Sequence, residues 1–146
     1  MKDVREDILA RLLVVVEGIP NIRSAHRNNV DIPEDSLPAV VVFDGDEETN
    51  GADDRSARLS GRPYVARMMP EIVIAQQAEL VGGELSTLRR ELIRRVLNDA
   101  TLIAHVGGNG AIRYLGCQTD IGWMRSLHGA LLAQFMFQYS LKIEEL

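Results

Sequence analysis

Cysteine, lysine and long apolar runs are all scarce in this chain of 146 residues. Cys117 is its single cysteine, so an internal disulfide and a metal site built from several cysteines are both excluded. No apolar run approaches the roughly 20 residues that a membrane-spanning helix needs, which predicts a protein without membrane association. The N-terminal stretch mixes acids with bases and holds no long apolar block, so we expect no signal peptide and synthesis in the cytoplasm.

Basic residues are outnumbered by acidic ones, 16 to 21, and the formal net charge at pH 7 is −5. Affinity for nucleic acid comes largely from neutralising phosphates, so this balance argues against a nucleic-acid-binding module. Lys2 and Lys142 are the only lysines. Arginine favours bidentate pairing and interfaces more than lysine does, although genome composition explains the same bias. The length and the 46% apolar content are typical of one globular domain, placed at residues 1–146.

The first third of the chain predicts one helix and two strands. Val4 to Glu17 carries apolar residues at steps of three and four, with Asp3 as the expected N-cap and Gly18 as the stop. Ile22 to Asn28 is typical of a short polar edge strand. Pro38 to Phe43 is apolar on both parities, which indicates a central strand covered on both faces.

A charged segment from Asp44 to Pro63 breaks the pattern, because it has no apolar period. We expect a long loop at about 44–63, of the kind that is functional or disordered in a compact domain. A hairpin extension with its tip at Asn50-Gly51 is the alternative. The charged residues of this segment considered as a contact site are Asp44, Asp46, Glu47, Glu48, Asp53, Asp54, Arg55, Arg58 and Arg62.

The middle of the chain predicts a strand and then helical structure. Val65 to Gln77 has strand character, with Pro70 at its beginning or at a bulge. Glu84 to about Asn98 carries a helical apolar stripe, and residues 101–106 add a short helical turn. Ala111 to Ile121 is the next strand, with Gly116 as a candidate bulge.

The last strand is the strongest signal in the sequence. From Leu131 to Ile143 one parity is apolar and the other is mostly polar. The apolar parity is Leu131, Ala133, Phe135, Phe137, Tyr139, Leu141 and Ile143. The opposite parity includes Gln134, Met136 and Gln138, which suits a surface that is covered only when subunits meet.

Together these elements predict an α+β fold. We expect a mainly antiparallel sheet with two helices packed on one face. The strand at 111–121 should pair with the last strand as a long C-terminal β-hairpin.

No arrangement of residues in the sequence predicts catalysis, a metal or a cofactor. The acidic segment resembles the start of a calcium loop, but Thr49 and Arg55 stand where glycine and the bidentate glutamate are needed. Gly107 to Gly110 lacks the ending of a phosphate loop. Cys117 is interpreted as a small core residue. The three histidines, His26, His105 and His128, form no pair with metal-ligand spacing. We therefore expect a protein that is not an enzyme.

Four arginines lie on the helix predicted at 84–98, namely Arg89, Arg90, Arg94 and Arg95. They form a solvated helix face, an inter-subunit face that meets the acidic segment of a neighbouring chain, or a site for nucleic acid. Opposite charges on different faces of one subunit can match head to tail, and head-to-tail contacts close into rings.

The chain resembles the tail terminator proteins, also called tail completion or minor tail proteins, of long-tailed bacteriophages. The resemblance covers nearly the whole length and rests on the size and the helix-first order. It also rests on Asp31-Ile32-Pro33 leading to Pro38-Ala39-Val40-Val41-Val42, on Asp44-Gly45-Asp46-Glu47, and on Ala133-Gln134-Phe135-Met136-Phe137-Gln138-Tyr139.

The resemblance implies a structural protein of the virion that forms a hexameric ring. Such a ring caps the tail tube at its head-proximal end, stops polymerisation and joins the head. The implied partners are further copies of the chain, the major tail tube protein and head–tail connector proteins, and assembly takes place in the host cytoplasm. The charged segment would then contact the tube or line the lumen, and DNA would pass through without specific binding.

Two other functions remain open at this stage. One is a head–tail connector or neck protein of similar size, and the other is a small nucleic-acid-binding module that uses the arginine face. For the charged segment, replacing Asp46, Glu47 and Glu48 by alanine should leave stability nearly unchanged but impair tail assembly.

Overall fold

The computed structural model describes residues 2–49, 64–77, 83–108, 111–121 and 128–146. These residues form a five-stranded sheet in the order β1-β2-β3-β5-β4. The strands are β1 (Ser24–Arg27), β2 (Ala39–Thr49), β3 (Tyr64–Gln77), β4 (Ile112–Ile121) and β5 (His128–Leu141). The helices are α1 (Val4–Glu17), α3 (Gly83–Asn98) and α4 (Ala100–Val106), with short 3-10 turns η1 (Glu34–Ser36) and η4 (Ile143–Glu145).

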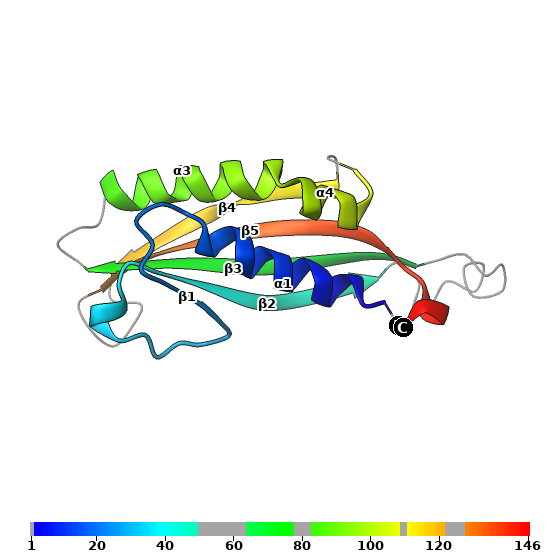
Figure 1. Ribbon diagram of the computed structural model, residues 1–146, viewed down its shortest axis with the longest axis horizontal. Helices are drawn as coiled ribbons and strands as arrows, with labels where there is room; N and C mark the ends of the chain where they lie inside the picture. The colour runs from blue at the N-terminus through cyan, green and yellow to red at the C-terminus, as the bar shows by residue number, and fades with distance from the viewer. Residues whose placement is uncertain (1, 50–63, 78–82, 109–110, 122–127) are drawn as a thin grey trace.

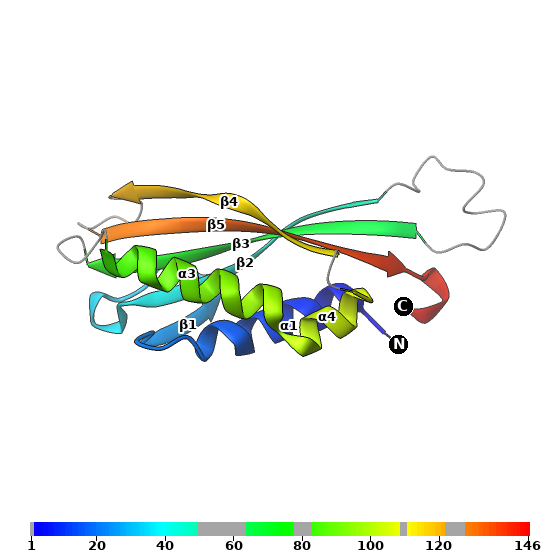
Figure 2. The same ribbon diagram turned by 90° about the horizontal axis from the view of Figure 1, so that it is seen from above.

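The predicted α+β fold is confirmed. The pairs β2–β3, β3–β5 and β4–β5 are antiparallel, and β1 pairs with β2 in parallel. The α-helices cover one face of the sheet, and the two ends of the described chain lie close together (Figures 1 and 2). The helical turn expected at residues 101–106 is the third helix, α4. Asp99 separates it from α3, since its extended backbone ends one helix and its side chain caps the next.

The main core lies between the helices and the inner face of the sheet. The apolar stripes of α1 and α3 face Met68 and Ile72 of β3 and Phe135 and Phe137 of β5, all fully buried. Burying one such side chain contributes about 1.5–3 kcal/mol, so this layer holds the helices on the sheet. The buried helix residues are Ile8, Leu9, Leu12, Val15, Val16, Leu85, Leu88, Leu92, Val96 and Leu102.

The predicted alternation of β5 is confirmed, although its limits shift. The strand begins at His128 and ends at Leu141, so Ile143 belongs to η4. β5 lies inside the sheet, between β3 and β4, and β3 has the same length of 14 residues. Gly116 does sit at a bulge, where the β4–β5 register shifts. The C-terminal hairpin partners are therefore as the sequence predicts.

Among the described residues, the outer face of the sheet is covered at one end only. A parallel pair needs a crossover, and the chain between β1 and β2 crosses this face (Figure 1). There Ile32 and Leu37 of the crossover form a small second core with Ala39, Val41, Val73, Ala75 and Ala130. This explains why β2 begins as an apolar strand on both parities.

β2 continues to Thr49, so the expectation of a loop from Asp44 onward was wrong for residues 44–49. Thr49 pairs with Ala66, so β2 and β3 form the two strands of the expected hairpin extension. Residues 50–63, which include the predicted tip at Asn50-Gly51 and the rest of the predicted loop, lie outside the described residues.

A bulge in β2 explains how the strand passes Pro70, which has no amide hydrogen for the ladder. The β2–β3 register shifts between Phe43 and Asp46, opposite Pro70, and Gly45 takes a φ of 68° there. A Cβ on Gly45 would overlap the carbonyl oxygen of Met69 and lie 3.1 Å from the Cα of Pro70. Only glycine fits both the backbone angle and this contact.

We expect Gly45→Ala to lower the free energy of unfolding by about 3 kcal/mol or more, since a backbone clash adds to the left-handed strain. Gly107→Ala is the matched control, because Gly107 has a φ of 84° but nothing within 4 Å of a new Cβ. It should cost only about 1 kcal/mol. Urea denaturation measures both variants. Equal losses would show that the contact with β3 is unimportant.

An ion pair between Arg11 and Asp99 joins α1 to α4. Arg11 donates two hydrogen bonds to Asp99, at 2.9 Å from Nε and 2.8 Å from Nη2. Asp99 also accepts from the Leu102 amide at 3.0 Å as the N-cap of α4. The guanidinium of Arg11 and the Leu102 amide lower the pKa of the Asp99 carboxyl. The ionised carboxylate therefore contributes to stability at neutral pH.

Because the pKa of Asp99 is lower folded than unfolded, its contribution is complete above the unfolded value of about 4 and is lost as pH falls further. We expect Asp99→Asn, which keeps a capping oxygen, to cost about 1 kcal/mol at pH 7. The difference from the parent should shrink below about pH 4. Asp99→Ala should cost about 1 kcal/mol more through the lost cap. Urea denaturation from pH 7 to pH 3 tests this, and a pH-independent difference would contradict it.

Candidate assembly surfaces

The end of β2, Asp44–Thr49, is called the acidic arm below. Asp44 is the first residue of the arm and serves the fold itself. Its carboxylate accepts from Arg27 Nε at 2.9 Å and from Arg27 Nη2 at 3.1 Å. Arg27 also donates to Glu6 at 2.7 Å, which links β1, β2 and α1. These contacts lower the pKa of the carboxyls of Asp44 and Glu6. Asp44 is thus neutralised within the subunit.

The other acids of the arm point to opposite faces of the sheet. Glu47 accepts a hydrogen bond from the hydroxyl of Tyr139, whose side chain is buried in the main core. Asp46 and Glu48 have the other parity and are exposed on the outer face. Glu47 is exposed as well, but its carboxylate is hydrogen-bonded within the subunit, whereas the carboxylates of Asp46 and Glu48 face solvent. The remaining members of the predicted contact site, Asp53, Asp54, Arg55, Arg58 and Arg62, lie outside the described residues.

The arginine face of α3 is largely engaged within the subunit. Arg89 donates to the Tyr114 hydroxyl at 3.2 Å, and its guanidinium lies 5.6 Å from the centre of the same ring. Arg94 and Arg95 both pair with Glu91, at 2.8 and 3.4 Å. The pair between Glu91 and Arg95 is the one that helical spacing predicts.

Exposure separates these arginines further. Arg90 and Arg94 are exposed, while Arg89 and Arg95 are half-buried. Among the described residues, no ion pair joins this face to the acidic arm of the same chain. Because α3 lies on the helical face of the sheet and Asp46 and Glu48 are on the outer face, the two predicted surfaces are on different sides of the subunit (Figure 2).

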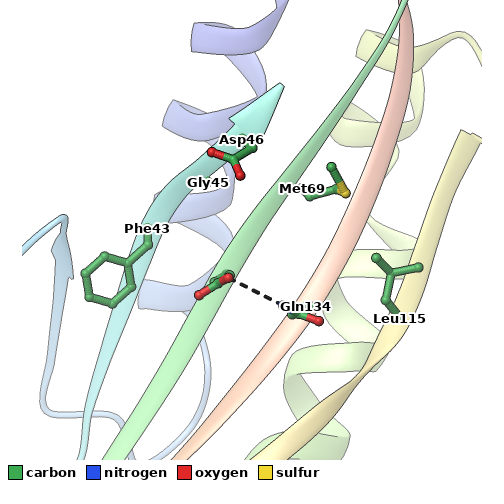
Figure 3. A pocket seen from close by; sticks show the side chains of 7 residues that line it. Phe43, Gly45, Asp46, Met69, Leu115 and Gln134 are labelled. Atoms are coloured by element: carbon green, nitrogen blue, oxygen red, sulfur yellow. Dashed lines mark hydrogen bonds between the residues drawn. The ribbon is translucent and has the colours of Figure 1, made fainter. Parts of the chain in front are cut away.

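A third surface was predicted only in part, from Gln134 and Met136 of the last strand. It is called the open-face patch and consists of Phe43, Met69, Leu115 and Met136, on the part of the outer face that the crossover leaves uncovered. Three of these side chains, with Asp46, Glu71 and Gln134, line a shallow hollow of about 310 Å³ (Figure 3). Leu115 retains 50% of its exposure.

The sequence signals only part of this patch. The parity of β5 places Gln134 and Met136 on the outer face, and Gln134 donates to Glu71 of β3 at 3.4 Å. Phe43, Met69 and Leu115 come from three other strands. Phe43 and Leu115 lie beside the bulges at Gly45 and Gly116, where the alternation of side chains is interrupted. Only the pairing between distant strands therefore shows that these residues lie on the same face.

A shallow groove between α1 and α3 has mixed character. It measures about 400 Å³ and is lined by Val14 of α1, by Arg94 and Arg95 of α3, and by the Arg11–Asp99 pair. Val14 is 52% exposed at this site. The arginines therefore border an apolar spot rather than a purely charged surface.

The remaining residues considered in the sequence are the histidines and Cys117. His26 lies in β1, where its Nε2 is 2.9 Å from the hydroxyl of Ser24. Cys117 is exposed on β4, so its interpretation as a core residue was wrong; the inner face at this edge strand is not fully covered. Within the described ranges, no cluster of three metal-ligating side chains is present. Among the helices described, none is long and apolar enough to span a membrane.

Comparison with known proteins gives no family assignment. No family model matches the chain, and no curated protein does so. Among solved structures, the chain is similar to a protein in a structure titled as the virion of a native gene transfer agent particle. The identity is 12%, 93% of each chain is covered, and the TM-score is 0.49. A likeness of this size is too low to define a common role.

The structure changes the expected outcome of removing the three acids of the arm. Glu47→Ala should cost about 1–2 kcal/mol, because the part-buried hydroxyl of Tyr139 loses its acceptor. The double variant Asp46→Ala/Glu48→Ala should stay within about 0.5 kcal/mol of the parent, since both carboxylates are exposed. Thermal and urea denaturation distinguish the two variants. A large loss in the double variant would place these acids in the folded core.

Proposed function

We propose that this chain is a structural protein of a phage-type virion, a tail terminator that forms a ring on the end of the tail tube. The proposal starts from the resemblance of the sequence to that family. It is supported by an α+β domain that begins with a helix, places the apolar strand β2 inside the sheet and closes with β5. A structural rather than catalytic role is part of the proposal.

The observation that carries the proposal is the open-face patch. Its four side chains expose apolar surface on a sheet face whose other end is covered by the crossover. Methionine and phenylalanine are enriched at protein interfaces, and a polar rim usually surrounds them. Here the rim contains Asp46, Glu71 and Gln134. We take the patch as a surface that is covered on assembly.

A ring would explain why the acidic arm and the arginine face lie on different sides of one subunit. The acidic arm and the arginine face lie on different sides of the subunit, so a contact between them joins two different surfaces of two copies. Such heterologous contacts close into a ring when the rotation between copies allows it. Six copies is the number that the resemblance implies.

The remaining assignments follow from this role. The partners would be further copies of the chain, the tail tube protein and a head–tail connector, at the head-proximal end of the tail. DNA would pass through the ring without specific binding, as a subunit with a net charge of −5 is not built to hold phosphates.

A head–tail connector of similar size is the second candidate function, and it would use the same patch against a head-side ring. Nucleic-acid binding is less well supported, because Arg89, Arg94 and Arg95 already have partners within the subunit. A gel shift with generic duplex DNA at low salt would reveal any such binding.

The test is assembly with and without tail tubes. We expect the protein to form rings, seen by light scattering after size exclusion and by negative-stain imaging, at high concentration or on tubes polymerised from the tail tube protein of the same gene cluster. Capped tubes should stop growing. A strictly monomeric protein that leaves tube length unchanged would refute the proposal, and binding only to a head-side ring would favour the connector.

A matched pair of variants tests the patch in the same assay. Leu115→Asp should weaken ring formation at least about tenfold, because it places a charge in the patch. Val30→Asp is the control, since Val30 is 56% exposed but lies on the crossover. Both side chains are half-exposed, so both variants should keep the melting temperature within a few degrees, by the usual cost of surface changes. Equal loss of assembly in both would remove the patch from the interface.

A further inference from the structure

Besides the outer side of the short strand β1, two strand edges of the subunit have no strand neighbour among the described residues. β1 pairs with β2 only from Ala39 to Val42. Asn28 and Arg5 then bond to the backbone of Asp44 and Gly45, at 3.1 and 3.2 Å. From Asp46 to Thr49 the acidic arm pairs with β3 alone.

The other edge is the outer side of β4, which pairs with β5 alone. Charges and bulges at both edges guard against random pairing. Asp46 and Glu48 do so on the arm, and the bulge at Gly116 does so on β4.

The direction of the strands allows these two edges to meet. β2 and β5 run the same way, because each is antiparallel to β3, and β4 runs opposite to β5. A second copy in the same orientation, placed beside β4, therefore presents its arm as an antiparallel partner. Antiparallel pairing is the common way to extend a sheet across an interface.

Charge sets the register between the two edges. Asp46 lies opposite Met69, and Met136 lies opposite Arg113. The β3–β5 register, which pairs Met68 with Phe137, places Met69 opposite Met136. One row on the outer face thus runs Asp46–Met69–Met136–Arg113, with an exposed acid at one free edge and an exposed base at the other.

We propose that copies of this chain join edge to edge, with β4 of one copy paired to the acidic arm of the next and Arg113 beside Asp46 of that neighbour. This rests on the proposed ring and assigns the β4 edge, rather than the arginine face of α3, as the surface that the acidic arm meets. If successive copies are related by rotation about an axis parallel to the strands, the row Asp46–Met69–Met136–Arg113 of one copy lies level with the same row of the next. Arg113 of one copy then meets Asp46 of its neighbour. The open-face patches of successive copies then form one continuous band.

A face-to-face dimer is the competing arrangement. Two outer faces related by a two-fold axis would also bring Arg113 of each copy near Asp46 of the other. The difference is in closure: the two-fold contact ends at two copies, whereas the edge contact leaves a free edge at each end until a ring closes.

Disulfide trapping distinguishes the two arrangements. Asp46→Cys and Arg113→Cys are combined in a Cys117→Ser background, since residues directly opposed across antiparallel strands lie within reach of a disulfide. After mild oxidation of the full chain, we expect a ladder of covalent species beyond the dimer on a non-reducing gel. The yield should exceed that of either single variant by about tenfold or more.

Two controls fix the register and the polarity. Asp46→Cys with Gln118→Cys, an exposed position farther along the same strand and face, should give little product. An equimolar mixture of the two single variants should stop at the dimer, because each chain then carries one reactive position. Melting temperatures verify that every variant is folded.

The outcomes separate this contact from the proposed function. A double variant that stops at the dimer would overturn the edge contact and support the two-fold arrangement. Larger oligomers by light scattering without cross-linking would overturn the edge contact but leave the ring in place. A ladder from a protein that fails to cap tubes would keep the contact and remove the terminator role. Chains that neither associate nor cross-link at high concentration would refute both.

Discussion

The pairing of β3 with β5 is the constraint on which the rest of the structure depends. The two 14-residue strands pair from Tyr64–Leu141 at one end to Gln77–His128 at the other. Their inner faces supply Met68, Phe135 and Phe137 to the main core. Because side chains alternate, a shift of one residue would turn this set toward solvent. The fixed register therefore holds the helices on one side and, by the same alternation, decides which residues make up the outer face.

Two bulges in the sheet, at Gly45 and before Gly116, shape its outer face. Pro70 cannot donate to the ladder, and the bulge at Gly45 accommodates it in β2. Beyond the bulge β2 continues past the end of β1, so among the described strands only β3 pairs with residues 46–49 of the acidic arm. The bulge before Gly116 places Leu115 on the outer face beside β5. Both bulges thus create surface that the subunit does not use for its own core.

The local part of this architecture could be predicted from the sequence, and the long-range part could not. The apolar steps of α1 and the alternation of β5 are set by neighbours within a few residues, so the predicted spans agree closely with the structure. The acidic arm was misread because its strand conformation comes from pairing with β3, which is distant in the chain, and not from an apolar period. Cys117 was misplaced for a similar reason, since its exposure depends on β4 being the edge strand.

Formal charge alone does not identify the residues available to a partner. Asp44 and Asp46 are two positions apart, yet the first is neutralised by Arg27 and the second is exposed at a free edge. The open-face patch, with four partly exposed side chains, is small beside the roughly 800 Å² that each partner buries in a stable interface. A single contact of this kind would be weak, so the proposed assembly would have to combine several. In a closed ring each copy makes two contacts and the last one forms within the assembly, which raises its effective concentration without any new interaction. A chain whose single contacts are weak can therefore still form a stable closed ring.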